Sequence, residues 1–140
     1  MDNISERQSD RFATFLQHES VENIVELILF NLGFKSNLQG TKFLVEAIVK
    51  MYTTQIHWLC KQLYPQIAEK YNTKGQRVER SIRHAIYECY ASGNLVRANE
   101  MLGCQIVNNY PPTNSEFISS VCTWLRIEKT YVRSNEKKDC

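Results

Sequence analysis

Residues 73–86 read Thr-Lys-Gly-Gln-Arg-Val-Glu-Arg-Ser-Ile-Arg-His-Ala-Ile, and this stretch separates into two faces when it is wound into a helix. At about 3.6 residues per turn, one face is apolar and consists of Val78, Ile82, Ala85, Ile86 and Cys89. The opposite face carries Gln76, Arg77, Arg80, Arg83, His84 and Tyr87. The spacing predicts an amphipathic helix from about Lys74 to Ala91, because Ser92-Gly93-Asn94 is a typical helix stop.

A second, shorter helix is predicted immediately before this one, from Tyr64 to Tyr71. Pro65 suits its first turn, where a missing N–H costs little. Asn72-Thr73 then forms a turn, and Thr73 with Gln76 matches a capping box at the start of the longer helix. A short helix, a tight turn and a longer basic helix make the helix-turn-helix pattern.

The rest of the chain is also helical in its apolar spacing, and no strand alternation is found. Further helices are expected at about 20–32, 41–52, 95–102 and 114–127, the last with a capping box formed by Thr113 and Glu116. The predicted fold is an all-α, six-helix single domain over residues 20–128, with polar tails at 1–19 and 129–140. Phe43, Tyr52 and Trp58 are assigned to its core. Trp124 is also assigned to the core, with a contact to a neighbouring copy through the last helix as the alternative.

Charge is informative here through its position rather than its total. The net charge is only +2, but four basic side chains lie between Lys74 and Arg83 against a single acid, Glu79. Positions four residues after Arg77, Arg80 and Arg83 hold no acid, so these arginines lack the partners that a merely solvated helix face would carry. We therefore expect an anionic partner for this face, with an ordinary solvated surface as the alternative.

DNA is the partner that these residue types fit best. Arginine pairs with guanine, glutamine with adenine, and a carboxylate with the cytosine amino group, in the major groove. The predicted DNA-binding residues are Lys74, Gln76, Arg77, Glu79, Arg80, Arg83 and His84. Arg77 and Glu79 are expected to read bases, since a carboxylate beside phosphates is otherwise unfavourable.

Other classes of protein are weakly supported. Five cysteines without a CxxC pair suggest reduced thiols, four of them acting as small core residues and Cys140 lying exposed at the end. His57 and Cys60 lie one helical turn apart but have no third ligand, so neither an enzyme nor a metal site is expected. No cofactor motif appears, and no apolar run approaches the roughly 20 residues that span a bilayer. A cytoplasmic protein is expected.

Several motifs in register resemble one family. Residues 63–73 (LYPQIAEKYNT), 77–86 (RVERSIRHAI), 92–94 (SGN) and 112–118 (PTNSEFI) are similar to the DNA-binding effector domain of the sporulation-initiation master response regulator of endospore-forming Firmicutes. The resemblance covers roughly residues 20–128. It implies a six-helix fold and recognition of an operator box resembling TGTCGAA, with tandem copies bound by adjacent domains. It also places Arg77, Glu79, Arg80, Arg83 and His84 at the DNA.

The chain departs from the family pattern in three places. Gln76 stands where a small hydroxyl residue is usual, Gly75 replaces a better helix former, and no receiver domain with its phosphoacceptor aspartate is present. A stand-alone relative of the effector domain is therefore expected, with an excised domain as the alternative. Possible partners are RNA polymerase and a second copy on tandem sites. The rival function is an interaction protein or competitor that titrates a full-length relative, RNA polymerase or operator sites.

Overall fold

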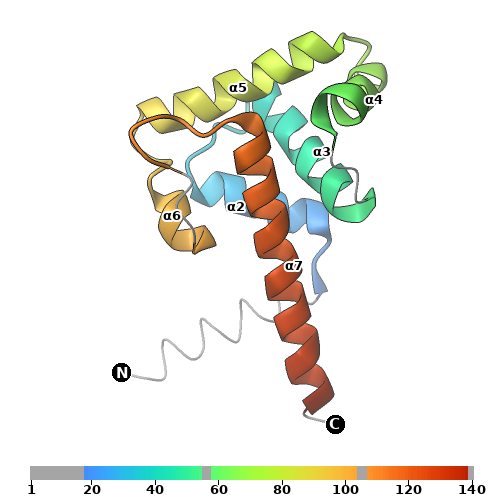
Figure 1. Ribbon diagram of the computed structural model, residues 1–140, viewed down its shortest axis with the longest axis vertical. Coiled ribbons are helices and arrows are strands. Elements are labelled where there is room, and N and C mark those ends of the chain that lie inside the picture. The colour runs from blue at the N-terminus through green and yellow to red at the C-terminus, as the bar shows by residue number, and fades with distance from the viewer. Residues whose placement is uncertain (1–17, 55–57, 104–106, 139–140) are drawn as a thin grey trace.

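The computed structural model describes residues 18–54, 58–103 and 107–138, with side chains to residue 129. Within these ranges it contains six α-helices and one π-helical turn, and no strand (Figure 1). The elements in chain order are α2 Val21–Asn31, α3 Gln39–Thr54, η1 Leu59–Leu63, α4 Tyr64–Lys70, α5 Gly75–Ala91, α6 Arg97–Leu102 and α7 Asn114–Lys138. The expected all-α, six-helix class is confirmed.

Helix α2 begins and ends with local signals that the sequence carries. Ser20 is its N-cap, and the Ser20 hydroxyl accepts a hydrogen bond from the Asn23 amide at 3.2 Å. At the other end Gly33 adopts a left-handed φ of 92°, and the next amide, of Phe34, donates to the Leu29 carbonyl at 3.0 Å. This turn directs the chain towards α3.

Helix α3 packs directly against α5, and the contact is so close that backbone meets backbone. A Cβ atom added to Gly40, in the first turn of α3, would lie 1.9 Å from the carbonyl oxygen of Ser81 in α5. Only glycine allows this approach. The position of α5 is therefore fixed in part by the absence of a side chain on a neighbouring helix.

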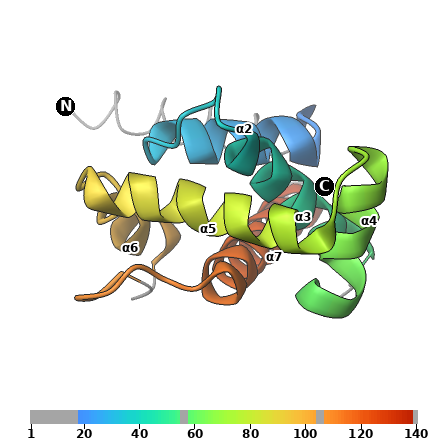
Figure 2. The same cartoon turned by 90° about the horizontal axis from the view of Figure 1, so that it is seen from above.

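The core lies between α2, α3, α5 and the first half of α7. From above, α5 crosses one side of the molecule while α7 is seen nearly end-on behind it (Figure 2). The largest side chains that are fully buried are Phe117, Ile24, Leu29, Leu32, Leu44, Ile48, Leu63, Ile67, Ile82, Ile86 and Leu95. These residues come from six of the seven elements and from the loops beside them, so a single core holds the domain together.

Helix α7 starts as expected but runs further. The Thr113 hydroxyl accepts from the Glu116 amide at 3.1 Å, and the Glu116 carboxylate accepts from the Thr113 amide at 3.4 Å, which confirms this capping box. The helix was expected to end near Ile127, with a loose tail from Glu128, but it continues to Lys138. Six of the eleven residues from Glu128 to Lys138 are Glu, Lys or Arg, which are good helix formers.

Two of the expected core residues lie on the surface. Trp58 is 62% exposed, and Cys60 is exposed as well. The prediction was wrong because the chain here forms a π-helical turn, in which the Leu63 amide bonds the Trp58 carbonyl five residues back at 3.2 Å. The wider turn rotates these positions away from the face that α-helical spacing predicts.

The other expected core positions are confirmed where the structure describes them. Phe43 is buried, and Tyr52 and Trp124 are partly buried against the core. The thiols of Cys89 and Cys122 are also buried, whereas Cys104 and Cys140 lie outside the described residues. Within the described ranges no helix is both long and apolar enough to cross a membrane.

Candidate nucleic-acid interface

The turn between α4 and α5 is held by the end of α4. Tyr71 is the C-cap, and Asn72 adopts a left-handed φ of 55° that asparagine tolerates better than most residues. The Thr73 amide donates to the Ala68 carbonyl at 2.8 Å and the Asn72 amide to the Glu69 carbonyl at 3.3 Å. This pair of hydrogen bonds is a Schellman motif, which fixes the angle at which α5 leaves the turn.

The predicted capping box at Thr73 and Gln76 is wrong. The N-cap of α5 is Lys74, one residue later, and no side chain caps this end of the helix. The Thr73 amide donates to the Ala68 carbonyl of α4, so it is not free to donate to the Gln76 side chain as a capping box requires. The free amides in the first turn of α5 are therefore available to an anion such as a phosphate.

Helix α5 has the two faces that its spacing predicted. Val78, Ile82, Ala85, Ile86 and Cys89 are buried. The predicted DNA-binding side chains Lys74, Gln76, Arg77, Arg80, Arg83 and His84 are exposed, and Glu79 is partly buried at the edge of the same face. The structure thus brings all seven onto one continuous surface along the helix and its first turn.

Arg83 forms an ion pair on this surface, although the sequence predicted no acidic partner for it. An Arg83 guanidinium nitrogen lies 3.2 Å from a Glu79 carboxylate oxygen, so Arg83 has an acidic partner four residues before it rather than after it. His84 lies 3.9 Å from the carboxylate of Glu88. Arg77 and Arg80 form no ion pair with any side chain in the part of the chain that the structure describes. The unpaired positive charge is therefore concentrated in the first half of α5.

Glu79 consequently has a structural explanation of its own. Its pairing with Arg83 places a carboxylate in this basic surface whether or not it reads a base. The inference that only base reading could justify Glu79 is therefore wrong. Arg83 nevertheless contacts one oxygen of the carboxylate, and a carboxylate has further lone pairs to offer.

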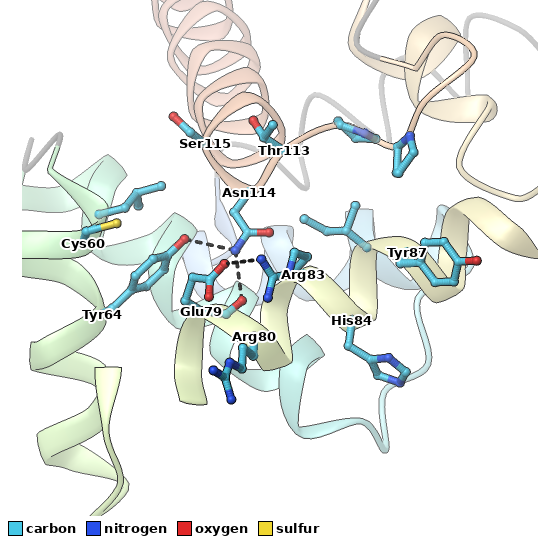
Figure 3. Close-up of a pocket in the computed structure, with 14 residues that line it drawn as sticks. Cys60, Tyr64, Glu79, Arg80, Arg83, His84, Tyr87, Thr113, Asn114 and Ser115 are labelled. Carbon is cyan, nitrogen blue, oxygen red and sulfur yellow. Dashed lines mark hydrogen bonds and ion pairs between the residues drawn. The ribbon is translucent and has the colours of Figure 1, made fainter. Parts of the chain in front are cut away.

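A hollow of roughly 940 Å³ borders this surface between α5, η1 and the segment that leads into α7. Arg80, Arg83 and His84 line it from α5, Tyr64 from α4, and Pro112 from the segment before α7. Figure 3 shows the first residues of α7 reaching down towards α5 across this hollow. The surface beside α5 is therefore concave rather than flat.

Asn114, at the first position of α7, is a contact that reasoning from the sequence missed. Its side-chain nitrogen donates to the Tyr64 hydroxyl and to the backbone carbonyl of Glu79, each at 3.1 Å (Figure 3). Burial raises the pKa of Tyr64, and the hydrogen bond from Asn114 partly opposes that rise. The only signal in the sequence is the asparagine itself, directly after the cap residue Thr113.

Comparison with known families identifies the chain. A family model described as sporulation initiation factor Spo0A, C terminal, matches residues 25–125. The chain belongs to this family. The matched range includes α3 to α6 complete and the turn and basic helix just described. The Spo0A C-terminal family is one of DNA-binding domains of sporulation regulators, and the resemblance drawn from the sequence motifs is confirmed.

Membership in the Spo0A C-terminal family also bears on the enzyme alternative, because this is an effector-domain family rather than an enzyme family. His57, half of the suggested His57–Cys60 pair, lies outside the described residues. Among the described residues no group of three or more His, Cys, Asp and Glu side chains is placed to hold a metal ion. Burial raises the pKa of the Cys89 thiol, and of the Cys122 thiol, to about 11, which makes both poor nucleophiles.

Proposed function

We propose that this domain is a sequence-specific transcription regulator that places α5 in the major groove of an operator box resembling TGTCGAA. The observation that supports this most directly is the pair of exposed arginines, Arg77 and Arg80, which have no acidic partner among the described side chains. Unpaired guanidinium groups on a rigid helix suit guanine edges and phosphates. DNA binding also implies that the protein acts in the cytoplasm.

Arg77 and Glu79 are the proposed base readers. Arg77 lies on the exposed side of the first full turn of α5, where recognition helices usually meet base edges. Its guanidinium fork can donate to both major-groove acceptors of a guanine. Glu79 keeps carboxylate lone pairs beyond the one that faces Arg83, and these can accept the cytosine amino group.

The remaining residues are proposed to hold the backbone and neighbouring bases. Lys74 and the uncapped amides at the start of α5 suit a phosphate, and Gln76 lies two residues after Lys74 in the same turn. Arg80, Arg83 and His84 are divided between phosphates and bases. If about five phosphates are neutralised, log affinity should fall with log salt with a slope of about −4 to −5.

The test is Arg77→Ala, measured by fluorescence anisotropy on duplexes that carry either the box or a scrambled version of it. We expect the substitution to remove about 1–3 kcal/mol of binding to the box and little from the scrambled duplex. Arg97→Ala removes the same charge from α6 and serves as the control. Equal losses on both duplexes for Arg77→Ala would contradict the base-reading role.

Contacts between neighbouring copies are proposed to involve α7. One helix-turn-helix domain buries limited surface, so tight binding benefits from a second domain on an adjacent box. Ile127 is 61% exposed on α7, and Trp124 is only partly buried nearby. These side chains suit a homodimer contact on tandem sites. Ile127→Ser should lower the cooperativity of binding to two boxes and leave binding to one box unchanged.

The rival proposal is that the domain titrates a partner, such as RNA polymerase or a full-length relative, or competes for operators without activating. Exposed apolar side chains away from α5, such as Phe30 at 69% and Val96 at 62%, are consistent with a protein partner. A complex that forms without DNA and survives Arg77→Ala would favour titration. Operator binding without stimulation of transcription would favour the competitor.

A further inference from the structure

Asn114 is one of two buried polar residues among those described, and it lies where three helices meet. It is only 9% exposed, and it belongs to α7 while its partners belong to α4 and α5. In Figure 3 its side chain projects from the start of α7 between Tyr64 and the pair formed by Glu79 and Arg83. The contacts span 50 and 35 positions in the sequence.

The orientation of this amide is set by its partners. The Glu79 carbonyl can only accept, so the amide must turn its nitrogen towards that carbonyl. The second N–H of the same nitrogen then meets the Tyr64 hydroxyl, which accepts it. Both protons of the side chain are thereby used. Its oxygen, by contrast, is buried and has no hydrogen-bond partner in the described part of the molecule.

Such an arrangement is poorly suited to stabilising a core. An unsatisfied buried oxygen costs free energy, and an apolar residue of similar shape would avoid that cost. What the amide does provide is a directional link between helices that otherwise meet through non-directional apolar contacts. The carbonyl that it holds belongs to Glu79, between the two exposed arginines Arg77 and Arg80.

We propose that Asn114 is a positioning residue, which fixes the depth and rotation of the first turns of α5 against α7 and α4. The side chains of Arg77 and Glu79 are thereby held where they can contact base edges. The inference rests on the proposed function, since it concerns how the same helix reads DNA. A displacement of about 1 Å is enough to spoil a bidentate contact, whereas contacts to phosphates tolerate more movement. Asn114 therefore acts on specificity rather than on general affinity for DNA.

Two substitutions separate this role from packing. Asn114→Asp keeps the volume and suits the first turn of a helix, where a negative charge is favourable, but it removes both donors and points a carboxylate at a carbonyl. Asn114→Ala removes volume and donors together. For both variants we expect the preference for the operator box over the scrambled duplex to fall about tenfold. Affinity for the scrambled duplex should stay within about twofold of the wild type. The slope of log affinity against log salt should be unchanged.

The control is Cys122→Ala, which also removes a buried side chain and a hydrogen bond from α7. The Cys122 thiol donates to the Ile48 carbonyl of α3, remote from the contacts of Asn114. It should lower the unfolding temperature and leave the preference for the box unchanged. Because Asn114→Asp keeps the side-chain volume and leaves no cavity, it decides the outcome even if Asn114→Ala does not fold.

Each result of this comparison has one meaning. A wild-type domain that does not distinguish the two duplexes would reject the proposed function itself. If the wild type prefers the box and Asn114→Asp keeps that preference, the positioning role is overturned. It is also overturned if Cys122→Ala loses the preference as well, because specificity would then follow stability alone.

Discussion

Replacing Gly40 with alanine should destabilise the domain although it adds only one methyl group. The new Cβ would lie 1.9 Å from the carbonyl oxygen of Ser81 and 2.6 Å from the carbonyl carbon of the same residue. Both are backbone atoms of α5, so no side-chain rotation can relieve the contact. Helices α3 and α5 must separate instead.

The size of the effect follows from two opposing contributions. The helices must move apart by about 1.1 Å to restore even a tight 3.0 Å contact at Ser81, and overpacking of this kind costs about 1–3 kcal/mol. Alanine is the better helix former by up to about 1 kcal/mol, and less in a first turn, where Gly40 lies. We therefore expect a net loss of about 2 kcal/mol in the free energy of unfolding, which at this chain length lowers the unfolding temperature by roughly 5–10 °C.

Gly75→Ala is the matched control, because Gly75 also lies at the start of a helix. A Cβ atom there would meet nothing closer than 3.6 Å, which is an ordinary contact. This variant should be about 0.5 kcal/mol more stable than the wild type. Thermal unfolding followed by circular dichroism at 222 nm measures both. A Gly40→Ala domain that unfolds at or above the wild-type temperature would refute the close approach of α3 and α5.

Three further results are expected. Asn72→Ala should lower stability by about 1–2 kcal/mol and Asn72→Gly should not, because the residue has a left-handed φ of 55°; urea unfolding decides this. Thr113→Ala should lower the free energy of unfolding by about 1 kcal/mol, because it removes the N-cap hydrogen bond of α7. Thr73→Ala removes no capping hydrogen bond and should change the unfolding midpoint little. At pH 8 a maleimide should label exposed Cys60 but not Cys89, because burial both shields this thiol from the reagent and raises its pKa to about 11.

Much of α5 was predictable because its pattern is local. The buried positions repeat at helical spacing, so the exposed face follows from the sequence without knowledge of the neighbours. The pair formed by Glu79 and Arg83 is equally local and could have been found by examining the position four residues before the arginine as well as after it. The confirmed cap at Thr113 is a third example, since its hydrogen bonds stay within one turn.

The failures arose where distant or competing contacts decide the structure. Thr73 has the residue type of an N-cap, but its amide is already bound to the end of the preceding helix. Trp58 has helical spacing, but a π-helical turn changes the direction in which it points. The partners of Asn114 lie 50 and 35 positions away, and no periodicity along a single chain reports such contacts.

The unexpected length of α7 has a consequence for reach. At about 1.5 Å per residue its 25 residues extend for roughly 37 Å, and Figure 1 shows the far end directed away from α5. If α5 lies in the major groove, the last turns of α7 would be separated from the DNA by a distance comparable to one helical repeat of the DNA. A protein that binds the end of α7 could therefore do so without contacting the DNA.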